Sequence, residues 1–124
     1  MSPTRKTPTA KLRLENVPEE LRAELLPALK RLVERTQPQG LWLFGSWARG
    51  EPSRRSDIDL LVMGLADRRR LAAYDLVLQA FETCPLPVQP LIASPALLAR
   101  HGDAPFWRSV KQEALPLLEG SCFP

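Results

Sequence analysis

Two short apolar runs separated by a polar connection constrain the fold of this 124-residue chain more than any other feature. The first run is LWLF at 41–44, followed at once by Gly-Ser at 45–46, and the second begins with Asp-Ile-Asp at 57–59. Short apolar runs bounded by Gly, Pro and Ser are typical of buried strands. The sequence therefore predicts strands at 41–44 and 57–63. The second starts in alternation and ends fully apolar, which predicts that only its first half is open on one face.

Helical patterns precede and follow these two strands in the sequence. A helix is predicted to start at Pro18, with a kink or a break at Pro27 and an end near 36–40. Its core face consists of leucines at helical spacing, namely Leu21, Leu25, Leu29 and Leu32. A second helix is predicted at 67–83, with an apolar stripe formed by Leu71, Tyr74, Leu78 and Phe81.

The last third of the chain predicts one more strand and two helices. The strand at 86–94 contains Pro87 and Pro90, which each remove a ladder donor, so we expect it at a sheet edge. A short helix is predicted at 95–101 and a longer one at 104–119, with Phe106, Val110 and Ala114 in register and Trp42 and Trp107 in the core. The order α-β-β-α-β-α predicts an α/β (α+β) fold, a small mixed sheet with helices packed on it.

Composition narrows the class of protein. The chain is 44% hydrophobic and 25% charged, which suits one globular domain, and we predict a disordered basic tail at 1–15 followed by a domain at 16–124. No run approaches the ~20 apolar residues of a membrane span, and the N-terminus has no apolar core of a secretory signal. We therefore expect a cytoplasmic protein without membrane contact. The net charge of +3 is small, so nucleic-acid binding through the basic tail is a less favoured interpretation.

Asp57 and Asp59 present two carboxylates on one face of the predicted strand, because residues two apart in a strand point the same way. Two like charges this close raise each other's pKa unless a cation lies between them. Hard oxygen ligands at this spacing suit Mg²⁺ or Mn²⁺, which in turn bind phosphate oxygens. An exposed alternation without any chemistry is the alternative interpretation of the same pattern.

Gly45 and Ser46 supply features of a phosphate site. Glycine lets the backbone approach a ligand closely, and residues 46–49 can start a short helix whose N–H groups point at an anion. The Ser46 hydroxyl and the Arg49 guanidinium add further donors. Trp47 could stack on a nucleotide base or pack in the core. Ser56, next to Asp57, is a candidate for the nucleotide-binding set or a simple strand-edge serine.

The Gly-Ser pair and the aspartate pair together match a known pattern. Gly45-Ser46, ten residues and then Asp57-Ile58-Asp59 resembles the signature of the DNA polymerase β nucleotidyltransferase superfamily. The longer string LFGSWARG…SDIDLLV resembles its minimal nucleotidyltransferase (MNT) branch, and most of the chain shares this resemblance. The resemblance implies a Mg²⁺-dependent transfer of a nucleoside monophosphate, most simply AMP from ATP, to a hydroxyl. Asp57 and Asp59 would hold the metal, and Gly45, Ser46 and Arg49 the triphosphate.

The resemblance also implies a partner. Members of the MNT branch often act as antitoxins beside a helical HEPN-domain protein, in some cases by adding AMP to a tyrosine of that toxin. We therefore expect a HEPN-domain partner for this chain. Whether the chain also associates with itself stays open.

The chain departs from the family pattern at one position. A third carboxylate usually comes from a later strand, but the corresponding triplet here is Val88-Gln89-Pro90, and a neutral amide cannot act as a general base. Asp103 and Glu113 could replace it only if the fold brought them close, which we do not expect. An inactive relative that neutralises a HEPN partner by binding alone is therefore the alternative function.

Overall fold

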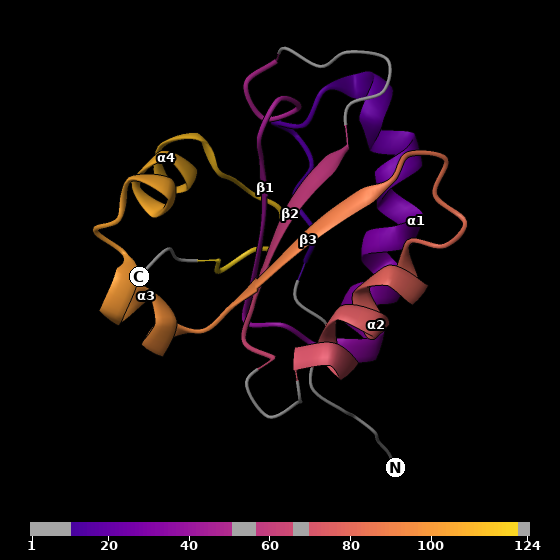
Figure 1. Ribbon diagram of the computed structural model, residues 1–124. Helices are drawn as coiled ribbons and strands as arrows, with labels where there is room; N and C mark the ends of the chain where they lie inside the picture. The colour runs from indigo at the N-terminus through magenta and orange to yellow at the C-terminus, as the bar shows by residue number, and fades with distance from the viewer. Residues whose placement is uncertain (1–10, 51–56, 66–69, 122–124) are drawn as a thin grey trace.

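The computed structural model describes residues 11–50, 57–65 and 70–121, and in this part of the chain four strands form one mixed sheet (Figure 1). The strands are β1 (Gly40–Phe44), β2 (Ile58–Met63), β3 (Val88–Ala93) and β4 (Leu115–Pro116), in the spatial order β3-β2-β1-β4. β1 is antiparallel to both β2 and β4, whereas β2 and β3 are parallel. The mixed sheet is confirmed, and β3 lies at its edge, as its prolines predicted.

Helices cover both faces of the sheet. α1 (Glu19–Thr36) and α2 (Arg70–Ala80) lie on one face, and α3 (Pro95–His101) and α4 (Pro105–Glu113) lie on the other (Figure 1). Alternate residues of β2 divide between two hydrophobic clusters, because neighbouring side chains of a strand point to opposite faces. Leu60 belongs to the cluster under α1 and α2, and Leu61 belongs to the cluster under α3 and α4. Burial on both faces is why the strands read as continuous apolar runs.

α1 confirms the predicted leucine face and corrects the predicted break. The four leucines predicted for its core face are fully buried, but the helix runs without interruption from Glu19 to Thr36 with Pro27 inside it. Pro27 lies on the exposed side of the helix. Water can therefore serve the carbonyl that loses its N–H partner there, and the ring does not disturb the packed face.

The predicted stripe of α2 is wrong for two of its four members, and a third, Tyr74, is only partly buried. Leu71 is 79% exposed and Leu78 is 46% exposed, whereas Phe81, just beyond the helix, is buried as predicted. The buried face consists of smaller side chains, namely Ala73, Val77 and Ala80. Small residues let α2 approach α1 closely, and Arg31 of α1 donates a hydrogen bond to the carbonyl oxygen of Ala80 at 2.9 Å. Residues 67–69 of the predicted helix lie outside the described part of the chain.

The helix predicted at 104–119 is shorter than expected. α4 ends at Glu113, and Leu115–Pro116 form β4 against β1. The reason is Pro116, because the residue before a proline is disfavoured in helical conformation. Within α4, Val110 is buried as predicted, but the core aromatic residue is Trp107, and Phe106 is 53% exposed. Trp42 is also buried, so both tryptophans assigned to the core are confirmed there.

The structure corrects the predicted boundary of the N-terminal tail. Leu12 bridges to Leu118, and the Arg13 N–H donates to the Leu117 carbonyl oxygen at 2.8 Å. Residues 11–15 thus pack along the C-terminal segment and belong to the folded domain. The first ten residues lie outside the described part of the chain. In the part described, no helix is both long and apolar enough to cross a bilayer.

The two leucine environments predict different costs for the same substitution. We expect Leu25→Ala to lower the free energy of unfolding by about 2–5 kcal/mol, because Leu25 is fully buried on the core face of α1. Leu71→Ala removes the same atoms from a side chain in solvent and should change stability by less than about 0.5 kcal/mol. Chemical denaturation of both variants measures the difference, and equal costs would contradict the packing described for α2.

Candidate active site

The Gly-Ser pair lies where β1 ends and the chain turns back toward β2. Gly45 has a φ of 79°, a conformation that side chains other than glycine rarely adopt. The Arg49 N–H donates to the Gly45 carbonyl oxygen at 3.0 Å, and Gly50 N–H to the Trp47 carbonyl oxygen at 3.3 Å. Residues 46–49 thus form a hydrogen-bonded turn rather than the start of a helix that the sequence predicted. The turn is compact enough to hold its residues close to the sheet.

Trp47 anchors this turn in the hydrophobic core. Its side chain is 7% exposed and belongs to the cluster under α1 and α2. Of the two interpretations that the sequence left open, packing in the core is therefore the one that the structure supports.

Asp59 meets this turn from the neighbouring strand, and Asp57 lies two residues before Asp59. Asp59 of β2 pairs with Phe44, so it lies next to the first residue of the turn. An ideal Cβ at Gly45 would overlap the Asp59 carboxylate, which leaves no room for any residue but glycine. Asp57 immediately precedes β2, and both aspartates are partly exposed. The Gly-Ser turn therefore lies beside the Asp59 carboxylate.

Asp59 is in an unfavourable electrostatic position. Its partial burial raises the pKa of the carboxyl above the ordinary value of 3.8, and the nearby charges of Asp57 and Glu113 raise this pKa further. Arg49 acts in the opposite direction and lowers it. A carboxylate with two acidic neighbours and one cation is a position that an added cation would stabilise.

Gln89 lies where the sequence predicted a third carboxylate. It pairs with Asp59 across the parallel strands β2 and β3. Its side-chain amide nitrogen donates a hydrogen bond to Oδ2 of Asp57 at 3.0 Å. The amide thus occupies the side of Asp57 that faces β3 and adds no negative charge to the site.

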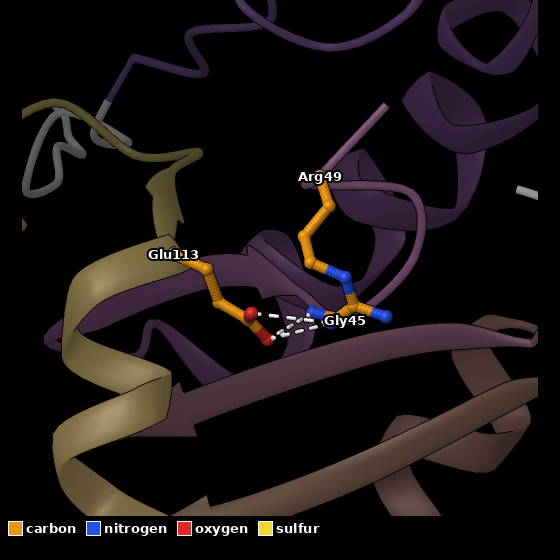
Figure 2. Close-up of polar contacts among 3 residues, drawn as sticks. All are labelled: Gly45, Arg49 and Glu113. Atoms are coloured by element: carbon orange, nitrogen blue, oxygen red, sulfur yellow. Dashed lines mark hydrogen bonds and ion pairs between the residues drawn. The ribbon is translucent and has the colours of Figure 1, made fainter. Parts of the chain in front are cut away.

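Glu113 is a residue that the sequence named and set aside, and the fold brings it to the turn. The backbone N–H of Gly45 donates to its Oε1 at 2.9 Å, and Nη1 of Arg49 lies 3.3 Å from Oε1 and 3.1 Å from Oε2 (Figure 2). The expectation that the fold would keep Glu113 away is therefore wrong. Pro116 was the available signal, because it ends α4 and places the next residues on a strand beside β1.

One pocket brings these groups together. It has a volume of about 450 Å³, within the range of small-molecule sites. Its polar lining includes Ser46, Arg49, Asp59 and Glu113, and Phe106 of α4 supplies an apolar wall. Asp57 is not among the lining residues, and Ser56 lies outside the described part of the chain. Within the described residues, no three His, Cys, Asp or Glu side chains are arranged to hold one metal ion.

The residues that build this pocket lie largely within a match to a known protein family. Residues 22–97, more than half of the chain, match the model of the nucleotidyltransferase domain. The chain belongs to this nucleotidyltransferase family. No curated protein matches the chain in sequence.

Two solved structures are similar to this nucleotidyltransferase domain. One is a candidate nucleotidyltransferase from Sulfolobus solfataricus, 17% identical, with 84% of this chain and 90% of that chain covered and a TM-score of 0.48. The other is a candidate minimal nucleotidyltransferase, 32% identical, with 80% of this chain and 94% of that chain covered and a TM-score of 0.49.

Nucleotidyltransferases generally use a nucleoside triphosphate and a divalent metal, and the aspartate pair fits such a metal. The donors are hard carboxylate oxygens, which Mg²⁺ prefers. The pKa of Asp59 is raised first by burial and then by the charges of Asp57 and Glu113, and a divalent cation at this carboxylate would offset both effects. Asp57 and Asp59 are therefore the residues of this site that suit the metal.

A comparison of Gly45 with Gly50 separates the stability cost of crowding Asp59 from the cost of backbone strain. Both have a positive φ, 79° and 74°, but no described atom lies within 4 Å of a Cβ placed on Gly50. Gly50→Ala should cost about 1–2 kcal/mol of stability from strain alone. We expect Gly45→Ala to cost about 1–3 kcal/mol more, because the Asp59 carboxylate must also move. Denaturation curves measure both, and equal losses would contradict the close approach of Gly45 and Asp59.

The raised pKa of Asp59 predicts a pH-dependent penalty on folding. Between the ordinary value of 3.8 and the higher folded value, the folded chain binds more protons than the unfolded chain. Stability contributed by this group is thus lost as pH rises through that interval. Asp59→Asn should raise the thermal midpoint at pH 7 without metal, and this gain should fade below about pH 3.9.

Asp75→Asn on the exposed side of α2 is the matched control and should leave the midpoint unchanged at both pH values. An Asp59→Asn variant that is less stable than the wild type at pH 7 would show that the carboxylate is favourably placed, against this account.

Proposed function

We propose that the chain is a minimal nucleotidyltransferase that transfers a nucleoside monophosphate, most simply AMP from ATP, to a hydroxyl of a partner protein. The observation that carries this proposal is the contact between the Gly45 turn and Asp59. It brings the backbone and serine donors suited to phosphate beside the Asp59 carboxylate within one pocket, and Asp57 lies two residues before Asp59. The family match supports nucleotidyl transfer in general.

Different residues at the pocket would bind different parts of the metal-bound nucleotide. Ser46 supplies hydroxyl and backbone donors for the triphosphate, and Arg49 supplies positive charge beside it. Gly45 contributes by having no side chain, which leaves the space taken up by the Asp59 carboxylate. Ser56 would join this set from the loop before β2. Asp57 and Asp59 hold the metal.

The reaction forms one bond and breaks one. An oxygen of the acceptor hydroxyl bonds to the α-phosphorus, and the bond from this phosphorus to the bridging oxygen breaks, so that pyrophosphate leaves with the electron pair. The hydroxyl proton passes to water, since Gln89 cannot accept it. When bound at the aspartates, Mg²⁺ supplies the charge that stabilises the phosphate oxygens. The turn and Arg49 orient the triphosphate for this step.

For the acceptor we propose a HEPN-domain protein, with the chain as the antitoxin of a toxin–antitoxin pair. The support is the resemblance of LFGSWARG…SDIDLLV to antitoxins of the MNT branch. In such a complex the partner would present a tyrosine hydroxyl to the open side of the pocket, where Phe106 is exposed.

A second candidate function is neutralisation of the same partner by binding alone. The hydrogen bond from Gln89 to Asp57 favours it, because an amide replaces the carboxylate that active relatives usually carry. Transfer of radiolabel from ATP to the partner separates the two functions. Label that depends on Asp57 supports the enzyme, and a bound but unlabelled partner supports the binding role.

Metal-dependent nucleotide binding tests the proposed site directly. We expect calorimetry to show binding of at least one of the four nucleoside triphosphates in Mg²⁺ and at least a tenfold loss of affinity in EDTA. Asp57→Asn combined with Asp59→Asn should cause a similar loss, since the carboxylates hold the metal.

Asp75→Asn removes the same charge from an exposed position on α2 and should bind as the wild type does. Affinity that is unaffected by EDTA and by the double substitution would contradict the assignment of the aspartates.

A further inference from the structure

The pairing of β1 with β4 determines where Glu113 lies. Trp42 pairs with Pro116, and Leu43 pairs with Leu115. Continued by two residues in each strand, this register brings Glu113 opposite Gly45. The Glu113 side chain accepts the hydrogen bond from the Gly45 N–H at 2.9 Å, so a carboxylate extends the ladder beyond its last backbone pair.

Glu113 gains nothing from its own helix. It is the last residue of α4, where the helix dipole disfavours a negative charge. It also faces Asp59, whose pKa its charge helps to raise after burial and Asp57. The favourable contacts of this carboxylate are those to Gly45 and Arg49, and its side chain is only 23% exposed. The placement of an acid here is therefore explained by the turn and not by the helix.

We propose that Glu113 is a positioning residue that holds the phosphate-binding turn in its nucleotide-ready conformation. This inference rests on the proposed function of the pocket. Glu113 fixes the first N–H of the turn and the guanidinium of Arg49 with charge-assisted hydrogen bonds, which are stronger than neutral ones. Ser46, which lies between these two residues in sequence, is thereby held at a set distance from Asp59.

The direction of the Gly45 N–H indicates whether Glu113 holds the turn in place or competes with the phosphates for its donors. β1 has β2 on one side and β4 on the other, and the Gly45 N–H bonds toward the β4 side, to Glu113. The Asp59 carboxylate approaches Gly45 from β2. A triphosphate held at the aspartates would thus meet Ser46 and leave the Gly45–Glu113 hydrogen bond in place. If Glu113 instead occupied donors that the phosphates require, its removal would strengthen binding.

Two substitutions at this position and one control test the inference. Glu113→Ala removes the acceptor, Glu113→Gln keeps an amide oxygen that can accept from Gly45, and Glu34→Ala alters an exposed acid on α1. For each we would measure the affinity for the Mg²⁺ complex of the triphosphate that the wild type binds most tightly. The thermal midpoint and the Gly45 amide resonance in ¹⁵N NMR spectra would be recorded alongside.

We expect Glu113→Ala to weaken binding roughly tenfold, because a loosened turn misplaces its donors. Glu113→Gln should stay within about threefold of the wild type, and Glu34→Ala should match it. The Gly45 amide resonance should shift in Glu113→Ala even without nucleotide. If Glu113 had a merely structural role, Glu113→Ala would lower the thermal midpoint, and Glu113→Gln would not restore the affinity for the triphosphate.

The outcomes separate this inference from the proposed function. Unchanged or tighter binding by Glu113→Ala overturns the positioning role, and tighter binding by both variants shows that Glu113 competes with phosphate. The proposed function survives either result, provided that binding still depends on Mg²⁺ and the aspartates. No binding by wild type or variants overturns the proposed function and this inference together.

Discussion

The antiparallel pairing of β1 with β2 is the constraint on which the site depends. It sets Phe44 opposite Asp59, so the turn that begins at Gly45 must pass directly beside a carboxylate. Only glycine fits there, because a Cβ would overlap Asp59 and because φ is positive. A shift of one residue in this register would point Asp59 to the opposite face of the sheet and separate the two halves of the site. The chemistry of the pocket is thus a consequence of strand pairing.

The helices on the two faces of the sheet contribute differently to the site. α1 and α2 bury one face with leucines and small residues and fix the turn through Trp47. α4 packs on the other face through Trp107 and also delivers Glu113 to the turn. Asp59 lines the pocket together with Phe106 and Val110 of α4, so apolar support and polar function share one face. Partial burial there raises the pKa of Asp59 and makes the site receptive to a cation.

Sequence reasoning succeeded where a local pattern decides the structure. The leucines of α1, the strands on either side of the Gly-Ser turn and the edge position of β3 follow from periodicity and proline placement. It failed where two faces of a helix were similarly apolar, since periodicity alone could not tell that α2 packs through Ala73 and Val77 rather than Leu71. It failed also for Glu113, because its contact with Gly45 spans 68 positions of the sequence and depends on the pairing of the two-residue strand β4 with β1.

The central claim is that Asp57, Asp59 and the turn at Ser46 form one site for a metal-bound triphosphate. A crystal structure of the chain with Mn²⁺ and a non-hydrolysable ATP analogue tests it most directly, because the anomalous signal of manganese locates the ion without ambiguity. The account predicts an anomalous peak in contact with the carboxylates of Asp57 and Asp59 and phosphate oxygens within hydrogen-bond distance of Ser46. Manganese and phosphates bound together elsewhere on the protein, with the aspartates uncoordinated, would contradict it.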